Sequence, residues 1–306
     1  MSSPEIQAKL AALVVQIAPG SQLLKSWPLS GGVSAQVTAL EILRNDGTLQ
    51  RWLVRQHGEV DRQRNPRIAA DEFKLLQLLR TAGIAVPQPY YVDTTGEMLG
   101  SPAIIIEFID GTSAFSPHDV DDFAYQLARQ LHKLHTLDIT HLDLDFLPHQ
   151  QVTIAAPPRQ LDESLSEGAI RRTLAQLDPI LHANPVALLH GDYWPGNILW
   201  QDGQLMAVID WEDAQVGDPL ADVANCRFEL CWTVSQEAMD RFTHHYRALS
   251  ALDFGNLPYW DLRAALRPAG KLSSWGLEPE SERRMRAAHQ TFVEAALARS
   301  SDQALL

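Results

Sequence analysis

Residues 188–200, with the sequence LLHGDYWPGNILW, place a histidine, an aspartate and an asparagine between two apolar runs. Asp192 and Asn197 are five residues apart, and the run ILW begins directly after Asn197, so both side chains should lie on a loop that enters a β-strand. A DG pair then turns the chain, and LMAVID returns as a second strand that ends at Asp210. The stretch therefore predicts a polar loop followed by a β-hairpin.

The hairpin should bring three oxygen-bearing side chains together. Its open end holds the residues before the first strand and after the second, so we expect Asn197 and Asp210 to lie close in space, with Asp192 near them. Two carboxylates and one amide oxygen suit a hard cation such as Mg²⁺, which also accepts water and substrate phosphates as ligands. A lone D-x-x-x-x-N is more often an ordinary turn, but the hairpin and the returning Asp210 favour the metal site.

The order of His190, Asp192, Asn197 and Asp210 agrees with the catalytic loop of protein kinases and with the metal-binding aspartate downstream of it. HGDYWPGNILW, followed by VIDWEDAQVGDPLADVA, resembles the aminoglycoside phosphotransferase family, small-molecule kinases that share the protein-kinase fold. The family pattern H-G-D-x-x-x-x-N, then I-D-W/F, then G-D-P-x-x-D is matched without gaps over residues 190–222.

This resemblance implies a role for each of three residues. Asp192 would be the catalytic base that orients the acceptor hydroxyl, Asn197 a metal ligand, and Asp210 the second metal ligand, bridging the phosphates. The phosphoryl donor would be ATP, with GTP as the alternative, and the metal cofactor Mg²⁺. The acceptor would be a small molecule with a hydroxyl group, because the chain continues from IDWED directly to AQVGDPLADVA and leaves no room for the activation segment of a protein kinase.

Three further polar residues of the motif have structural interpretations. By the same analogy, His190 is a neighbour that supports the loop. Asp218 and Asp222 in GDPLADVA should cap a helix and hold the catalytic loop, since Asp-Pro also reads as a plain N-cap followed by a first-turn proline.

Turn signals and hydrophobic periodicity divide the chain near Gly111. The first part predicts a small antiparallel sheet with one inserted helix, and the second part is mainly helical. Helices are expected at 4–18, 68–80, 121–137, 232–250 and 281–299. Strands are expected within 25–56, 86–93, 101–111, 198–200 and 205–210. Irregular segments are expected at 147–160 and 253–260. The predicted fold class is α+β, a bilobal protein-kinase-like fold with a nucleotide-binding lobe at 1–111 and a mainly helical catalytic and substrate-binding lobe at 112–306.

A glycine turn in LSGGVSAQV is the first candidate for phosphate contact in the N-terminal lobe. Its backbone N–H groups could approach phosphates. It lacks the G-x-G-x-x-G pattern, and a bare pair of glycines is more often only a hairpin. The family resemblance at Gly31, Gly32 and Ser34 favours phosphate contact.

The remaining nucleotide-site candidates follow from the protein-kinase comparison. Arg55 takes the place of the lysine on the third strand, and Glu72 lies on the inserted helix as its partner. A guanidinium group can grip phosphate and carboxylate with two hydrogen bonds, although both residues could equally be exposed surface charges. The segment containing Glu107 and Ile109 resembles the hinge, where backbone groups would meet the adenine.

Composition excludes several classes of protein. The net charge of −13 over 306 residues argues against nucleic acid and anionic membranes as partners and is compatible with a cationic substrate. The longest apolar runs are too short to span a bilayer, and the N-terminus lacks a secretory pattern, so a cytoplasmic location is predicted. The two cysteines, Cys226 and Cys231, should be buried hydrophobes and not a disulfide or zinc site.

Two functions of other classes stay open beside the small-molecule kinase: a nucleotide-binding pseudoenzyme that acts as a regulatory module, and a metal-dependent hydrolase. Within the kinase class, the family resemblance implies that the acceptor would be an aminoglycoside-like molecule, a sugar or an amino alcohol, or a metabolite such as choline, homoserine or a macrolide. Acidic residues that could bind an ammonium group are Glu229, Asp240, Asp261, Glu278 and Glu280. Two tryptophans, Trp211 and Trp260, could wall the acceptor cleft.

Overall fold

The structure is a computed structural model that describes residues 4–29, 35–113, 116–151, 154–177 and 184–303. The chain forms two compact units: the first consists of Met1–Gly111 and Met206–Glu212, and the second of Thr112–Leu205 and Asp213–Leu306. Met206–Glu212, which we expected in the second lobe, lies instead with the first unit. There the Val208 N–H donates to the Ala85 carbonyl at 2.8 Å.

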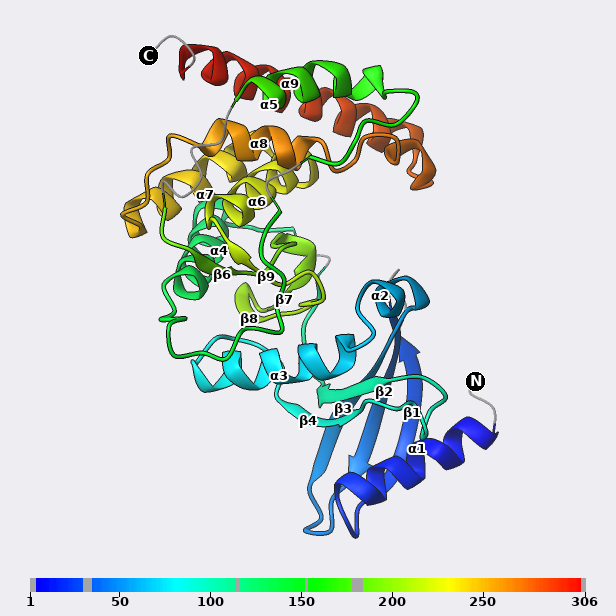
Figure 1. Cartoon of the computed structure of the whole chain (residues 1–306). Helices are drawn as coiled ribbons and strands as arrows, with labels where there is room; N and C mark the ends of the chain where they lie inside the picture. The colour runs from blue at the N-terminus through cyan, green and yellow to red at the C-terminus, as the bar shows by residue number, and fades with distance from the viewer. Residues whose placement is uncertain (1–3, 30–34, 114–115, 152–153, 178–183, 304–306) are drawn as a thin grey trace. The chain divides into compact units, whose positions relative to one another are not determined.

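A five-stranded antiparallel sheet forms the centre of the first unit (Figure 1). Its strands are β1 (Gln22–Leu29), β2 (Ala35–Leu43), β3 (Leu49–His57), β4 (Pro89–Asp93) and β5 (Ala103–Glu107). The order in space is β1-β2-β3-β5-β4, and each neighbouring pair is antiparallel. Helices α2 (Glu59–Arg64) and α3 (Ile68–Thr81) separate β3 from β4, and β5 returns between those two strands.

Helix α1 (Pro4–Ile17) covers part of this sheet because its apolar residues recur at helical spacing. Leu10, Leu13 and Val14 are buried and pack against residues of β2, β3 and β5. These sheet residues are Leu40, Ile42, Trp52, Val54, Ala103 and Ile105. Helix α3 buries Leu75, Leu76 and Leu79 and packs against β4 and β5. The core of the first unit therefore joins the sheet to both helices.

The turn between β2 and β3 forms at the predicted DG pair. The Asp46 carboxylate accepts hydrogen bonds from the Thr48 N–H (2.9 Å) and the Thr48 hydroxyl (2.7 Å). Gly47 has a φ of 82°, a left-handed conformation that glycine adopts without steric cost. Helix α2 was not expected, because its sequence EVDRQR has no apolar periodicity.

The second unit contains most of the helices (Figure 1). They are α4 (Val120–His135), α5 (Glu167–Gln176), α6 (Leu220–Thr233), α7 (Gln236–Leu249), α8 (Leu257–Ala265) and α9 (Pro279–Gln303), with short 3₁₀ turns η1 (Glu163–Leu165), η2 (Pro195–Asn197) and η3 (Leu272–Ser274). Helix α6 buries 11 of its 14 residues and packs against α7, α8 and α9. Such burial on all sides makes α6 the central helix of this unit.

Two small two-stranded sheets flank the polar loop at residues 190–197. Strand β6 (Ala187–Leu189) pairs with β9 (Gln215–Gly217), and β7 (Ile198–Gln201) pairs with β8 (Gln204–Val208). The predicted DG turn joins β7 to β8, with φ of 50° at Asp202 and 77° at Gly203. Two successive positive φ values are characteristic of a type I′ hairpin turn. Gln126 of α4 holds this turn through the Gly203 carbonyl and the Leu205 N–H, both at 2.9 Å.

Two expectations about the second unit were wrong in detail. The helical pattern at 232–250 is broken by Ser235, whose backbone is extended and whose hydroxyl caps α7 by accepting from the Ala238 N–H at 3.1 Å. The connector expected at 253–260 contains the start of α8, because proline is tolerated in the first turn of a helix. Helix α5, at Glu167–Gln176, lies in the part that was expected to be mainly helical, but no bounds were predicted for it.

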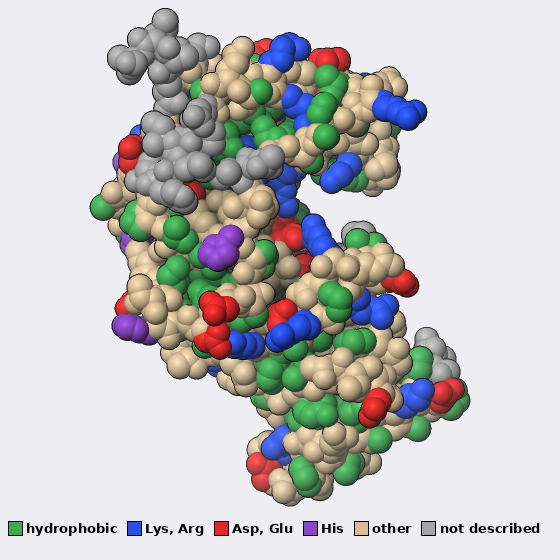
Figure 2. All heavy atoms as spheres, viewed as in Figure 1, with side chains coloured by type: hydrophobic (Ala, Val, Ile, Leu, Met, Phe, Trp, Pro, Cys, Tyr) green, Lys and Arg blue, Asp and Glu red, His purple; other side chains and the backbone are tan. Residues whose placement is uncertain are grey.

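The cysteines, the helices and the surface charge of the described residues can be compared with the expectations drawn from the composition. Cys226 and Cys231 are both buried and free. Among the described residues, no helix combines the length and the apolar character that crossing a membrane would require. Figure 2 shows acidic and basic side chains side by side on the visible face, so the net charge of −13 does not make this face uniformly acidic.

Candidate active site

A backbone turn that only glycine fits holds the polar loop in the second unit. Gly191 follows β6 and has a φ of 81°. A Cβ atom at this position would lie 1.9 Å from the Asp213 carbonyl oxygen, which is far inside van der Waals contact. Glycine is therefore required both by the backbone conformation and by the close approach of the chain after β8.

The Asp222 carboxylate of α6 also holds this turn in place. Its carboxylate accepts from the His190 N–H at 2.7 Å and from the Gly191 N–H at 2.9 Å, and it lies 3.3 Å from the His135 Nε2 atom. Burial alone would raise the pKa of Asp222, but the bonds from His135 and the His190 backbone lower it. Asp222 is thus a buried carboxylate that holds the loop, as the sequence predicted, and its i+3 neighbour on α6 is Asn225.

Asp192 and Asn197 lie together, as predicted. The Asn197 Nδ2 group donates to the Asp192 carbonyl at 2.9 Å and to the Asp192 Oδ2 atom at 3.1 Å. The 3₁₀ turn η2 brings Asn197 back toward Asp192, since the Asn197 N–H donates to the Trp194 carbonyl. His190 is fully buried, and its Nδ1 atom accepts from the Asp192 N–H at 3.2 Å. His190 therefore supports the loop, which agrees with the structural role expected for it.

Two residues that the sequence did not single out complete this group. The Arg267 Nη2 atom lies 2.8 Å from the Asp192 Oδ1 atom, and the Arg267 Nη1 group donates to the Asn225 side-chain oxygen. Asn225 in turn donates to the Tyr193 carbonyl at 3.2 Å and lies 3.5 Å from the Asp192 Oδ1 atom. We call Asp192, Asn197, Asn225 and Arg267 the Asp192 cluster. Asn225 follows Asp222 by three residues on one helix face, a signal that could have revealed it, whereas Arg267 has no local signal.

Glu229 lies on the same face of α6 as Asn225. Burial, assisted by the nearby Asp192 carboxylate, raises the pKa of Glu229 to about 7, although the Trp232 indole N–H donates to it at 2.7 Å. Near neutral pH this carboxyl group is therefore divided between its acid and its carboxylate forms. Glu229 is one of the five acidic residues that the sequence offered as ligands of an ammonium group.

In the first unit, Arg55 is surrounded by acidic side chains. It forms ion pairs with Asp210 and Glu212, and its Nε atom lies 3.7 Å from the Glu72 Oε2 atom. Glu72 also contacts the His57 ring at 2.5 Å. We call Arg55, His57, Glu72, Asp210 and Glu212 the Arg55 cluster. Arg55 is 8% exposed and Glu72 is 4% exposed, so the alternative that both are surface charges is wrong.

The electrostatics of the Arg55 cluster follow from this burial. Burial alone would raise the pKa of Glu72, but Arg55 and His57 lower it to about 2, with help from the Trp211 backbone N–H. Burial would lower the pKa of Arg55, whereas Glu72, Asp210 and Glu212 together raise it. Arg55 and Glu72 therefore both carry their charge at neutral pH.

Asp210 has an unusual backbone for a residue with a side chain. It follows β8 and has a φ of 69°, a left-handed conformation that costs a non-glycine residue roughly 1–2 kcal/mol. Strain of this kind is common at functional positions. The Asp210 side chain is 35% exposed, so one of its oxygens binds Arg55 while the carboxylate keeps contact with solvent.

The sequence pattern of the phosphotransferase enzyme family, APH, matches residues 28–266. The chain belongs to this family. The match covers the Arg55 cluster and most of the Asp192 cluster, and it ends one residue before Arg267. The family resemblance proposed from HGDYWPGNILW is confirmed.

Two curated proteins are similar to this chain. The chain is 27% identical over 170 residues to acyl-CoA dehydrogenase family member 10 of Mus musculus, a match that covers 50% of this chain and 16% of that protein. It is 26% identical over 226 residues to homoserine kinase of Beijerinckia indica, covering 66% of this chain and 68% of that enzyme. The chain thus spans only a small part of the length of the first of these relatives.

The fold is also that of known phosphotransferases. A structure of wild-type aminoglycoside 2′-phosphotransferase-IIIa in complex with GDP matches 97% of this chain and 98% of that chain, with a TM-score of 0.63 and 16% identity. The predicted α+β, protein-kinase-like fold class is confirmed.

The remaining nucleotide-site candidates belong to the first unit. Gly31, Gly32 and Ser34 lie outside the described residues. Glu107 ends β5, where its N–H donates to the Gln88 carbonyl at 2.8 Å and its side chain accepts from the Gln88 N–H at 3.1 Å. Nucleotide contact at Glu107 and Ile109 stays a prediction.

The two tryptophans considered as walls of an acceptor cleft are core residues. Trp211 is 2% exposed and donates to the Val208 carbonyl at 3.0 Å. Trp260 is 5% exposed and donates to Asp218 at 3.2 Å. Asp218 also accepts from the Leu220 N–H at 2.9 Å, but the N-cap residue of α6 is Pro219, so the expected N-cap position was wrong by one residue.

Proposed function

We propose that this protein transfers the terminal phosphoryl group of ATP, or of GTP, to a hydroxyl group of a small molecule, with Asp192 as the base. The observation that supports this most strongly is the restraint of the Asp192 carboxylate. One of its oxygens lies against Arg267 and Asn225, and the other accepts from Asn197. Phosphoryl transfer depends chiefly on positioning and on electrostatic stabilisation, so a carboxylate fixed in this way is suited to orient an acceptor hydroxyl and to accept its proton.

In this proposal, Asn197 and Asp210 are the metal ligands. The Asn197 Nδ2 group donates to two oxygens of Asp192. The Asn197 Oδ1 atom therefore points away from Asp192 and is available as a ligand atom. Asp210 offers the carboxylate oxygen that does not bind Arg55. Oxygen donors of this type fit Mg²⁺. When bound, Mg²⁺ would neutralise charge on the phosphates of the nucleotide.

The Arg55 cluster supports a nucleotide-binding role for the first unit. A guanidinium group held by Glu72 is placed as the family resemblance implies, and arginine can bind phosphate with two parallel hydrogen bonds. The similar phosphotransferase structure that contains GDP agrees with nucleotide use. In this proposal, Gly31, Gly32 and Ser34 contact phosphate, and the backbone at Glu107 and Ile109 contacts the base.

Two charged groups near Asp192 favour a particular kind of acceptor. Arg267 is half exposed and presents a guanidinium group, and Glu229 presents a carboxyl group that ionises near neutral pH. An acceptor that carries both an anionic and a cationic group beside its hydroxyl would satisfy both. A hydroxylated amino acid has this chemistry, and homoserine kinase is among the relatives. Aminoglycosides, which lack the anionic group, would leave Arg267 without such a partner.

The direct test is a screen for phosphorylated product with ATP or GTP, Mg²⁺, and homoserine, aminoglycosides, macrolides, sugars and amino alcohols as acceptors. We expect Asp192→Asn to lower turnover of the accepted substrate by about 10²–10⁴-fold, the usual contribution of a general base. Nucleotide binding measured by calorimetry should persist in this variant. The control Asp145→Asn changes an exposed carboxylate in the same way and should have no effect on turnover.

Each other outcome identifies a different function. Nucleotide consumption without any acceptor would indicate the hydrolase. Tight nucleotide binding with no turnover of any acceptor would indicate the regulatory module. Full activity in the Asp192→Asn protein would remove Asp192 as the base.

A further inference from the structure

A cavity on the far side of α6 from the Asp192 cluster is lined by arginine side chains. Its volume is about 480 Å³, within the roughly 300–1,000 Å³ that is typical of small-molecule sites. Three arginines line it: Arg227 of α6, Arg247 of α7 and Arg299 of α9. Because Arg227 follows Asn225 by two residues, it lies about 200° further round the helix, so the two residues face in opposite directions.

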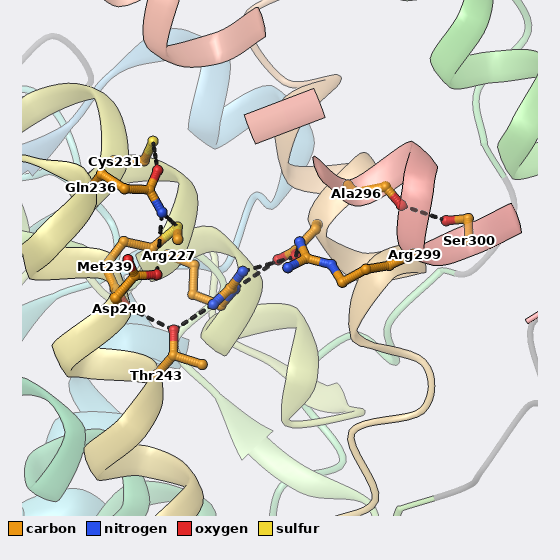
Figure 3. A network of polar contacts seen from close by, with 10 residues as sticks. Arg227, Cys231, Gln236, Met239, Asp240, Thr243, Ala296, Arg299 and Ser300 are labelled. Atoms are coloured by element: carbon orange, nitrogen blue, oxygen red, sulfur yellow. Dashed lines mark hydrogen bonds and ion pairs between the residues drawn. The ribbon is translucent and has the colours of Figure 1, made fainter. Parts of the chain in front are cut away.

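Figure 3 shows Arg227 and Arg299 pointing toward one another from different helices. They share one buried carboxylate. Arg227 donates to both oxygens of Asp261, at 3.0 and 3.1 Å, and Arg299 donates to Asp261 at 3.1 Å. Asp261 is fully buried, so its single charge compensates only one of the two guanidinium groups.

The third arginine of the cavity, Arg247, stacks on an aromatic ring. Its guanidinium carbon lies 4.5 Å from the centre of the Phe254 ring. With Asp240 as the carboxylate on the cavity wall, three guanidinium groups face two carboxylates in this region. One positive charge is therefore in excess, and an anion would compensate it.

Arg299 is only partly desolvated in this wall. Burial lowers its pKa, Arg227 and Arg247 lower it further by repulsion, and Asp261 and Asp240 offset only part of the effect. Arg299 nevertheless keeps 46% of its side chain exposed. It donates one N–H group to Asp261, and a guanidinium group has five. Donors remain for a ligand in the cavity.

The rest of the wall is apolar. Phe254, Leu257 and Pro258 lie at the start of α8 and line the same cavity. Ligand sites typically combine an apolar lining with a few convergent polar groups that set the orientation of the ligand. We propose that this cavity binds a small organic anion, with a phosphoryl or carboxylate group between Arg247 and Arg299 and an apolar part against Phe254, Leu257 and Pro258.

This site is separate from the proposed phosphoryl-transfer site, and its test does not require activity. The probes are phenyl phosphate and benzoate, with benzyl alcohol as the uncharged counterpart. Binding to the full chain is measured by calorimetry in EDTA without Mg²⁺, and by the shift of the melting temperature. We expect both anions to bind and benzyl alcohol not to bind. The stronger of the two anions identifies whether a phosphoryl or a carboxylate group is preferred.

Substitutions on one helix provide a matched comparison. Arg247→Ala removes a cation from the cavity without breaking the Asp261 ion pairs, and it should weaken anion binding at least tenfold, as expected for loss of a charge-assisted hydrogen bond. Arg241→Ala removes a cation from the exposed face of the same helix, where it pairs with Asp121 and Glu237, and it should leave binding unchanged. Arg299→Lys should retain part of the affinity because the charge is kept.

Two results would overturn the proposal. The first is equal weakening by Arg241→Ala and Arg247→Ala, which would mean that the anions respond only to the net charge of the protein. The second is the absence of heat and of a melting shift with either anion up to about 10 mM, a concentration that would reveal even a millimolar site.

Discussion

The Arg55 cluster and the Asp192 cluster both contain an arginine beside carboxylates, but they differ in burial. In the Arg55 cluster, the arginine side chain is 10% exposed and the Glu72 side chain is 3% exposed. In the Asp192 cluster, Arg267 is 42% exposed and Asp192 is 29% exposed. A buried ion pair is costly to break because the remaining charge has no solvent, whereas water can replace a lost partner at an exposed pair. The first cluster should therefore contribute more to folding than the second, in addition to the nucleotide-binding role proposed for it.

The largest expected effect on stability comes from removing the buried cation. Arg55→Ala leaves Glu72 buried without its guanidinium partner, and it should lower the free energy of unfolding by about 3–5 kcal/mol. Arg51→Ala on the same strand removes an arginine that pairs with Asp110 at the surface, with 38% of its side chain exposed, and should cost less than about 1 kcal/mol. Denaturant unfolding of both proteins measures the difference. Equal losses would show that burial does not distinguish the two pairs.

A pH-dependent effect of intermediate size is expected at Glu229. Its raised pKa means that the folded protein favours the neutral acid. The resulting stabilisation is complete below the usual carboxyl pKa of 4.5 and is lost as the pH rises through about 7. This contribution to the free energy of unfolding is on the order of 2 kcal/mol. It is smaller than that of a completely buried carboxyl group because the Glu229 side chain keeps some contact with solvent.

The measurement for Glu229 compares unfolding of the wild-type and Glu229→Gln proteins between about pH 5 and 8. The stability difference between them should shift in favour of the glutamine variant as the pH rises. Glu237→Gln, at an exposed position of α7, serves as the control. A pH-independent difference between the wild-type and Glu229→Gln proteins would contradict the raised pKa.

The smallest effect on stability is expected from Glu212→Gln. This variant tests which carboxylate is the principal partner of Arg55. Three carboxylates surround one guanidinium group, so Glu72 and Asp210 still compensate Arg55 after this change. Stability should change by less than about 1 kcal/mol. A loss as large as that caused by Arg55→Ala would mean that Glu212, and not Glu72, is the principal partner of the arginine.

Local sequence predicted the parts of the site that are held by local structure. Asp192 and Asn197 lie five residues apart on one loop, and the DG pair at Asp202 and Gly203 specified the hairpin after it. Glu72 and Arg55 were paired by analogy with protein kinases. The predicted meeting of Asp210 with Asp192 and Asn197 stays a prediction, because Asp210 belongs to the first unit and the other two to the second.

Residues that reach the two clusters through tertiary packing were harder to predict. Arg267 contacts Asp192 from beyond the end of α8, and neither its neighbours nor its spacing indicates this. His57 lies two residues after Arg55 on β3, where alternation would direct both side chains to one face, so its contact with Glu72 could have been anticipated. Helix α8 was missed because its proline-containing first turn has the composition of a connector.

The crossing of the chain from the second unit back to the first has a consequence for synthesis on the ribosome. Residues 1–111 emerge first, but Asp210 and Glu212, two of the partners of Arg55, are separated from them by about 100 residues that take roughly 5–20 s to translate. During that interval the nascent first unit has only Glu72 to balance its buried guanidinium group. We therefore expect this unit to acquire its final stability late, after most of the second unit has left the ribosome. A truncated protein ending at Gly111 should be less stable than the first unit of the full chain.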